Sequence, residues 1–484
     1  MLTHWPVIAP HIILALAGGL IFCLGAFWRG RPVNLLWWLA LAATAAAGLL
    51  ALGGPVSGPD QGVYGGLLDA GSYGRFFTCL ITCLSFLSLL LMRSYAADRG
   101  LTDEVLYGLV LLAALGMILV TGAIHWVVFF LGLELLSICL YVLIAVRREQ
   151  DFSLEAGLKY FVLGAVASSL VVFGIAMLYA ASGSLLIGPG LKAGISGGHG
   201  ALTLLGLGLL LSGLAFKVSL APLHVWTPDV YQGAPAPITA FLAAGSKTAV
   251  MALLIRLCAD LQGDLWTYWM LALWMLAALT MLAANLSALR EQRTKRLLAY
   301  SSAAQMGYLV MALVGAHYGG LSAALFFLTV YAFMDLGAFG LLGMLSPLRS
   351  DLDRLEDLWG LARRFPWQAG FFALCLLSLA GMPPTGGFVG KLLLFTATLQ
   401  AGHPVLALLG ALSAAAAFYY YFKVMAALYM KAPANGPAQP EINQSPTPFS
   451  VLALALIAAA LLFLGIFPAW LHSLAQIAVA SLGA

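Results

Sequence analysis

Long runs of apolar residues recur along the whole chain and are separated by short segments rich in Arg, Gly and Pro. Runs of about 18 residues or more can cross the hydrocarbon core of a bilayer as helices. The pattern therefore predicts an all-α polytopic membrane protein with fourteen transmembrane helices. We expect these helices near residues 9–28, 34–54, 71–92, 105–122, 124–146, 156–181, 201–226, 236–258, 266–289, 296–316, 320–345, 366–400, 404–430 and 448–472.

The composition agrees with a membrane location, because 62% of the residues are hydrophobic and only 9% are charged. A soluble domain typically has about 25% charged residues. The first apolar run has no Lys or Arg before it and is followed by Arg29 and Arg31. We therefore expect an uncleaved first helix rather than a signal peptide. The net charge of +4 gives no indication of a nucleic-acid partner.

The sequence motifs of common cofactor sites are missing. There is no glycine-rich dinucleotide motif after a strand, no P-loop and no Cys-x-x-Cys pair. The six cysteines are scattered through the predicted helices, and Cys79 and Cys83 share a helix face without a further ligand. We expect the cysteines to be small core residues, and the chain to bind no nucleotide, flavin, haem, iron–sulfur cluster or metal.

Basic residues in the connections between the predicted helices fall on alternate sides of the membrane. The connections on one side contain Arg29, Arg31, Arg93, Arg99, Arg147, Arg148, Arg290, Arg293, Lys295, Arg296, Arg349, Arg354, Arg363, Arg364 and Lys431. The connections on the opposite side contain Lys192. Because Lys and Arg accumulate in cytoplasmic loops, we expect both termini to lie outside the cytoplasm.

Four charged residues lie inside apolar runs: Glu134, Lys217, Lys247 and Lys391. A charge at the centre of a bilayer costs about 2.5–3.5 kcal/mol on insertion scales, so four of them cost roughly 10–14 kcal/mol. Buried lysines combined with a buried glutamate favour a function in proton transfer.

Two of the predicted helices are interrupted, and each interruption lies beside a lysine. Pro222 follows Lys217 in the seventh helix, and Pro383 and Pro384 precede Lys391 in the twelfth. The two helices are five apart and so run in opposite directions, which predicts two inverted five-helix repeats with a transport site at the breaks. The expected divisions are 1–104 (helices 1–3), 105–258 (first repeat), 259–430 (second repeat) and 431–484 (loop and helix 14).

Each embedded charge also has a purely structural interpretation. Lys217 and Lys391 could cap the carbonyl groups freed at the broken helices. Lys247 could form an ion pair with Glu134 or another group, and Glu134 could be a counter-ion that only fixes helix packing.

For other polar residues, the spacing alone does not distinguish a functional role from a structural one. Lys159 lies about one turn inside the membrane boundary, where it could extend to the surface, and it follows Glu155 at a favourable spacing of four. His224 could relay a proton or hydrogen-bond the freed backbone. Asp335 lies in the middle of the eleventh helix and could pair with a lysine that the sequence does not identify. Lys423 is expected to reach the membrane surface.

Several long segments resemble one family of membrane subunits. The segments are LGLELLSICLYVLIA, LEAGLKYFVLGAVASSL, FKVSLAPLHVWTPDVYQGAPAPITAFLAAGSK, TKRLLAYSSAAQMGYL and LAGMPPTGGFVGK. In this order they are similar to subunit N of bacterial respiratory complex I, the proton-translocating NADH–quinone oxidoreductase. Related antiporter-like subunits typically have an aromatic residue before the glutamate and a histidine in place of Lys247. Gly132 and Leu133 precede Glu134 here, which favours the subunit N family. Asp335 is not part of the family pattern.

The resemblance implies roles for five residues. Glu134 and Lys217 form the buried pair, Lys159 is the entry-side lysine, Lys247 is the central relay and Lys391 is the exit-side group. It also implies a multi-pass subunit of the bacterial inner membrane, a non-redox part of a translocase that contacts two other antiporter-like subunits. NADH, FMN, iron–sulfur clusters and a quinone would be bound by other subunits. The alternatives are an Mrp-type monovalent cation/proton antiporter subunit and a scaffold that has lost proton pumping.

Overall fold

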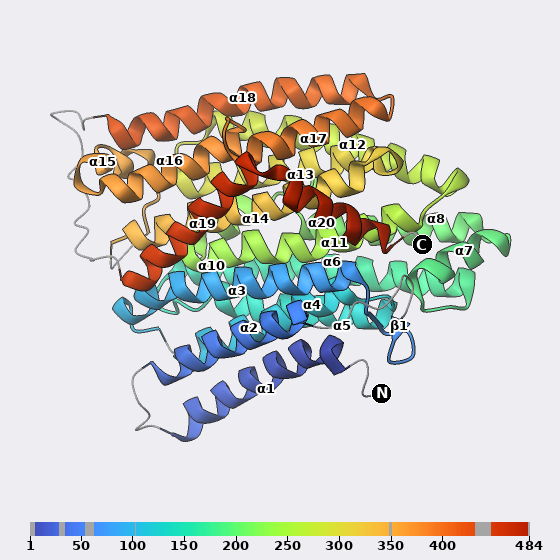
Figure 1. The fold of residues 1–484 in the computed structure, drawn as a ribbon, viewed down its shortest axis with the longest axis horizontal. Helices are drawn as coiled ribbons and strands as arrows, with labels where there is room; N and C mark the ends of the chain where they lie inside the picture. Colours follow the sequence, from blue (N-terminus) through green and yellow to red (C-terminus); the bar gives the residue numbers. More distant parts are fainter. Residues whose placement is uncertain are drawn as a thin grey trace.

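The computed structural model describes residues 5–28, 34–53, 62–101, 103–347, 351–430 and 447–482. Within these ranges, thirteen helices are long and apolar enough to cross a membrane, and they run along one common direction (Figure 1). Twelve of them are α1 (Trp5–Phe27), α2 (Leu35–Gly53), α3 (Ser72–Asp98), α4 (Asp103–Gly122), α5 (Trp126–Ile144), α6 (Asp151–Ser182), α8 (Gly200–Lys217), α12 (Gly263–Arg290), α13 (Thr294–Val314), α14 (Gly320–Leu345), α18 (Pro404–Tyr429) and α19 (Pro448–Ile466).

The thirteenth is a composite helix over Ala236–Asp260, which corresponds to the predicted eighth crossing. It consists of α10 (Ala236–Phe241), the π-helical segment η2 (Leu242–Ser246) and α11 (Lys247–Asp260). The predicted twelfth crossing is divided into α16 (Pro366–Ala380) and α17 (Gly386–Gln400), each shorter than a full span. The polytopic all-α architecture expected from the hydrophobic pattern is therefore confirmed.

The remaining elements are short connections. They are β1 (Gly62–Val63), β2 (Leu68–Asp69), α7 (Ile187–Ser196), α9 (Thr227–Gly233), η3 (Ala316–Tyr318), η4 (Leu355–Leu358), α15 (Leu361–Arg364) and α20 (Pro468–Ala480). The antiparallel pair of β1 and β2 was not predicted, because two-residue strands leave no periodic signal in the sequence.

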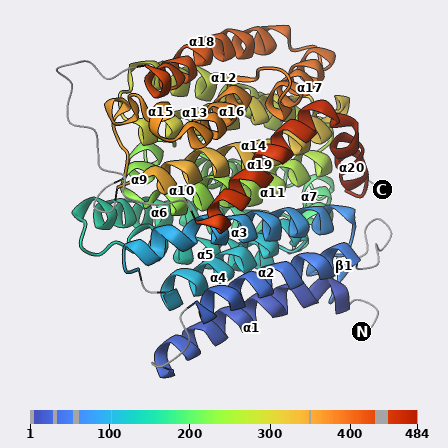
Figure 2. The same cartoon turned by 60° about the vertical axis from the view of Figure 1, so that its left-hand side comes forward.

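The centre of the bundle is formed by the composite eighth helix, α13 and α14. In the most apolar 18-residue stretch of each of these three helices, 100%, 94% and 94% of the residues are buried, respectively. In the corresponding stretches of α1 and α12, 33% of the residues are buried. Figures 1 and 2 show α11 and α14 between α18 at one margin and α1 at the other. Lys247, the first residue of α11, is completely buried in this central helix.

At the breaks in the helices, several of the freed backbone groups have hydrogen-bond partners. After α8, the indole of Trp226 donates to the carbonyl of Phe216 (2.9 Å), and the amide of Ala221 donates to Thr280 (2.9 Å). At the second break, Gly381 ends α16 in the left-handed conformation with φ 87°. Because an unpaired backbone group in a bilayer costs several kcal/mol, such partners are what allow a break at membrane depth.

α1 begins and α20 ends at the same end of the bundle (Figure 1), as an even number of crossings requires. Four of the basic residues used to assign the orientation, Arg29, Arg31, Arg349 and Lys431, lie outside the described residues. The inverted repeats and their boundaries stay predictions. Of the cysteines, Cys139, Cys258 and Cys375 are buried, whereas Cys23 and Cys83 are exposed, contrary to the core location expected for all six.

Candidate functional site

The first broken helix places Lys217 against α5. Lys217 is the last residue of α8 and is 3% exposed, and its Nζ donates a 2.7 Å hydrogen bond to the Oγ of Ser137. Ser137 lies one turn after Glu134 on α5, and the charge of Glu134 acts on Lys217. The Oε1 of Glu134 is buried without a hydrogen-bond partner among the described residues. The rings of Tyr141 and Tyr160 lie 5.7 and 5.8 Å from Nζ. Lys217 therefore bonds to another helix instead of capping its own.

The central lysine has a similar environment. Lys247 is 0% exposed, and its Nζ donates to the Oγ of Ser302 at 2.6 Å. The ring of Tyr231 lies 5.2 Å from Nζ, and the hydroxyl of Tyr331 lies 2.7 Å from Ser302. Asp335, one turn after Tyr331 on α14, acts electrostatically on Lys247. Lys247 is thus the lysine that the sequence could not assign to Asp335.

Lys391 contacts the end of the helix that precedes its own. It lies in α17, is 5% exposed, and donates to the carbonyls of Leu379 (2.7 Å) and Ala380 (3.1 Å) at the end of α16. The ring of Tyr308 lies 5.2 Å from its Nζ. This is the capping contact of the structural interpretation, and it distinguishes Lys391 from the two lysines that donate to serine.

Polar side chains connect the surroundings of Lys391 to those of Lys247. The amide of Gln305 donates to the carbonyl of Leu379 (3.1 Å) and to the hydroxyl of Tyr421 (3.0 Å). Tyr421 in turn contacts the hydroxyl of Ser301, the neighbour of Ser302. These residues were not predicted from the sequence. Their signal is a group of polar residues, SSAAQ, inside an apolar helix.

Lys159 is not buried with the other lysines. Its side chain is 42% exposed and lies 2.7 Å from Glu155 and 2.9 Å from Asp229. Asp229 also pairs with Arg296, and these four residues line a cavity of about 330 Å³. The spacing predicted the pair with Glu155, whereas the contact with Asp229 depends on the fold of the broken helix.

His224 lies in the turns between α8 and α9 and is half-buried. Its ring centroid is 6.4 Å from that of Tyr300, and the charge of Lys247 acts on it. Its Nδ1 is buried without a hydrogen-bond partner in the part of the chain that the structure describes.

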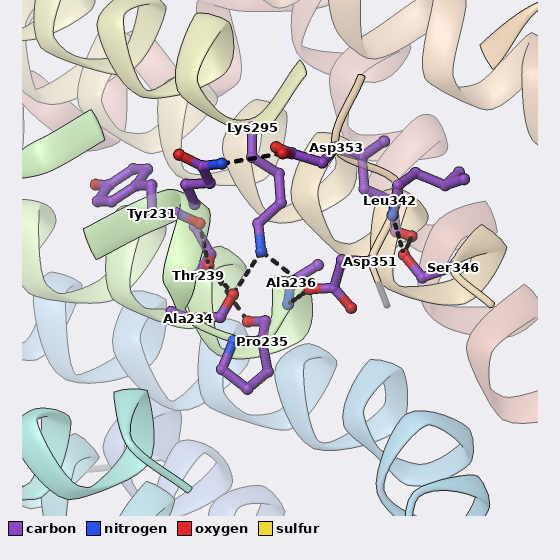
Figure 3. Close-up of polar contacts among 12 residues, drawn as sticks. Tyr231, Ala234, Pro235, Ala236, Thr239, Lys295, Leu342, Ser346, Asp351 and Asp353 are labelled. Carbon is purple, nitrogen blue, oxygen red and sulfur yellow. Dashed lines mark hydrogen bonds and ion pairs between the residues drawn. The ribbon is translucent and has the colours of Figure 1, made fainter. Parts of the chain in front are cut away.

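Lys295 differs from its expected position in a cytoplasmic loop, because it is buried with 1% exposure. Its Nζ lies 2.9 Å from the Oδ2 of Asp351, which also accepts from the amide of Ala236 at 2.9 Å (Figure 3). Burial raises the pKa of Asp351, but the charge of Lys295 and a hydrogen bond from Tyr95 outweigh it, so that this pKa lies below its ordinary value. The pair holds the segment after α14 against α10 and α13.

A second buried ion pair lies near the other end of the eighth crossing. Arg256, nine residues after Lys247, is 8% exposed and pairs with Asp69 of β2. Its guanidinium lies 5.1 Å from the ring of Tyr73, whose hydroxyl donates to the carbonyl of Ala252 (2.6 Å). The sequence analysis did not count Arg256 among the embedded charges.

The family model for the transmembrane region described as "NADH:quinone oxidoreductase/Mrp antiporter, TM" matches residues 123–417. NADH-quinone oxidoreductase subunit N 1 of Solidesulfovibrio magneticus is 44% identical over 461 residues, which are 95% of each chain. The chain belongs to the NADH-quinone oxidoreductase subunit N family. A chain in the structure of respiratory complex I from Thermus thermophilus with bound aureothin is 34% identical and superposes with a TM-score of 0.80, over 96% of this chain and 98% of that one.

The resemblance to the subunit N family found in the sequence is therefore confirmed. A chain of the Mrp complex from Dietzia also superposes well, with a TM-score of 0.81 over 99% of this chain and 96% of that one. It is only 20% identical, so this likeness shows the fold alone. The Mrp-type alternative is accordingly less well supported than membership of the subunit N family.

Proposed function

We propose that this chain translocates protons as a non-redox membrane subunit of NADH–quinone oxidoreductase. The observation that carries the proposal is the contact made by each of three buried ammonium groups. Lys217, Lys247 and Lys391 each donate to an uncharged oxygen at 2.6–2.7 Å. When an ammonium is bonded only to neutral groups, it can release its proton without leaving an unpaired charge in direct contact with the lysine. This property suits a site that is alternately loaded with a proton and emptied of it.

The proton path begins at the half-exposed cluster of Lys159, Glu155 and Asp229. It continues to Lys217, passes sideways to Lys247 with His224 beside it, and ends at Lys391. The connection through Gln305, Tyr421 and Ser301 described above supports the last step, because hydroxyl and amide groups can transmit protons or order water.

The energy scale is adequate for this path. Moving one charge through 150 mV costs about 3.5 kcal/mol. Two opposite charges about 4 Å apart at an effective dielectric constant of about 20 interact by roughly 4 kcal/mol. Forming or breaking an ion pair between Glu134 and Lys217 would therefore be of the size needed to drive one proton across.

The driving energy comes from electron transfer between NADH and a quinone in other subunits, which hold the FMN and iron–sulfur clusters. The subunit lies in the bacterial inner membrane with both termini on the periplasmic side. The other membrane subunits of the complex, including two further antiporter-like subunits, are its partners.

The test is to follow NADH-driven acidification of inverted membrane vesicles that contain the complete complex. Removing the charge with Lys217→Met should reduce acidification, while the amount of assembled complex in the vesicles stays normal. Lys423→Met is the matched control, because Lys423 lies outside the proposed path and bonds to the carbonyl of Glu291 (3.1 Å). Normal pumping by an assembled Lys217→Met complex would contradict the proposal. Sodium-linked proton exchange without NADH would favour the Mrp-type alternative.

A further inference from the structure

The environments of Lys217 and Lys247 share three features. In each, the ammonium donates to a serine hydroxyl, Ser137 at 2.7 Å or Ser302 at 2.6 Å. In each, a tyrosine ring lies between 5.2 and 5.8 Å from Nζ. In each, a carboxylate acts on the lysine and has one buried oxygen without a hydrogen-bond partner among the described residues. For Lys217 this carboxylate is Glu134, and for Lys247 it is Asp335.

Asp335 is positioned for contact with Lys247 by two hydroxyl groups. Its side chain is 1% exposed, and the hydroxyls of Ser302 and Tyr331 both interact with it. Ser302 is also the group to which Lys247 donates. The serine hydroxyl is therefore hydrogen-bonded to Lys247 and close enough to Asp335 to act on its carboxylate, which places it on a path for a proton from nitrogen to carboxylate oxygen.

The π-helical segment η2 contributes to this arrangement. It ends at Ser246, immediately before Lys247, and the carbonyl of Ala243 within it accepts a hydrogen bond from Tyr331 (3.3 Å). π-Helical turns inside α-helices are rare and occur frequently at functional sites. Here the turn joins the helix of Lys247 to the helix of Asp335 through a tyrosine that also contacts Ser302.

Asp335 also acts on a residue of the connection that leads toward Lys391. Its charge acts on Tyr421, which belongs to the connection that leads through Gln305 to the carbonyl bonded by Lys391. A carboxylate at this point lies between the central and the exit-side lysines. An acidic residue buried at membrane depth is costly and is by default a candidate functional group.

We propose that Asp335 is the counter-ion of Lys247 and the group that accepts its proton on the way to Lys391. The assignment rests on the proposed function and adds a residue to its path. In the transfer, a bond between Nζ of Lys247 and hydrogen breaks as Ser302 takes up this proton. Ser302 passes its own hydroxyl proton to an oxygen of Asp335. The charged lysine and the charged carboxylate both become neutral, with no net change of charge and no oxidant or reductant.

The experiment uses the complete complex in inverted vesicles and compares Asp335→Asn, Asp335→Glu, Lys247→Met and the double variant Asp335→Asn/Lys247→Met. NADH oxidation and acidification are measured per assembled complex. Asp335→Asn should lower the rate of acidification by at least about tenfold, as expected for loss of a positioned proton-transfer group. Asp335→Glu should restore most of it. In the double variant, Asp335→Asn should add little to the loss caused by Lys247→Met, because both changes interrupt one step.

Redox-induced infrared difference spectra provide a readout that a packing role would not affect. A carboxylic C=O band should appear during turnover in the wild type and disappear in Asp335→Asn. Wild-type pumping by Asp335→Asn, or strictly additive losses in the double variant, would overturn the assignment. If Asp335→Asn fails to assemble because Lys247 loses its counter-ion, the double variant should recover assembly, and its failure to do so would also overturn it.

Lys217→Met separates this assignment from the proposed function. Loss of pumping in Lys217→Met together with normal pumping in Asp335→Asn removes Asp335 alone from the path. Normal pumping in both removes the proposed function as well.

Discussion

The ammonium of Lys217 is held by Ser137, a residue of another helix one turn beyond Glu134, at 2.7 Å. The hydroxyl of Ser137 lies between Lys217 and the turn of α5 that carries Glu134. Its removal should therefore affect proton pumping. Ser137→Ala leaves a buried ammonium without its hydrogen-bond acceptor, a loss of about 1–3 kcal/mol, and acidification by vesicles should decrease. Ser168→Ala is the control, because the buried hydroxyl of Ser168 has no partner in the described ranges. Equal behaviour of the two variants would refute the role of Ser137.

Tyr421 connects Ser301 to Gln305 through its hydroxyl. Tyr421→Phe keeps the ring and removes this connection, so acidification should slow while assembly and NADH oxidation per complex change less. Tyr429→Phe is the control on the same helix, since Tyr429 is exposed at the end of α18. An effect on pumping from Tyr429→Phe as large as that from Tyr421→Phe would contradict the proposed connection.

The pair of Lys295 and Asp351 should be important for stability. Asp351→Asn leaves the ammonium of Lys295, which is 1% exposed, without its counter-ion, and breaking a buried pair in this way costs about 3–5 kcal/mol. Asp353→Asn should cost much less, because burial raises the pKa of Asp353 and its charge is already disfavoured. Thermal unfolding of the purified complex distinguishes the two. A milder effect for Asp351→Asn than for Asp353→Asn would be inconsistent with the structure.

The same two residues predict opposite dependences on pH. The folded pKa of Asp351 is below its ordinary value, so its stabilisation is complete above about pH 4 and is lost only as the pH falls through the folded pKa. The raised pKa of Asp353 means that its contribution becomes less favourable as the pH rises through that value. The stability difference between wild type and Asp351→Asn should therefore be constant from about pH 5 to 8 and narrow below about pH 4. A difference that already narrows at neutral pH would contradict this.

Gly387 lies where α17 approaches the end of α16. A Cβ atom there would lie 1.9 Å from the carbonyl oxygen of Ser378, so Gly387→Ala must displace the helix that carries Lys391. Overpacking of this kind costs typically about 1–3 kcal/mol, and both stability and pumping should decrease. Gly370→Ala, with no atom within 4 Å of the added Cβ, is the control in the same measurements. A well-tolerated Gly387→Ala would show that the two helices can separate at the break.

The charges of the site were visible in the sequence because Lys217, Lys247 and Lys391 interrupt apolar runs. Their partners were not, because Ser137 and Ser302 resemble the many small hydroxyl residues of membrane helices. Asp335 was noticed, but it is 88 residues from Lys247, and only the packing of α14 against the eighth crossing brings them together. Lys295 was misplaced because it stands in a basic segment, QRTKR, where loop and helix end cannot be separated by composition.

The ion pair of Arg256 with Asp69 restricts how the central lysine can move. Arg256 follows Lys247 by nine residues on α11, about 13.5 Å along the helix axis. Because Asp69 belongs to a separate hairpin, α11 cannot slide or turn about its axis without breaking a buried salt bridge. This pair would hold Lys247 at a constant depth, so that in the proposed path a proton would pass this point by side-chain rotation and hydroxyl reorientation, without a piston-like movement of the helix.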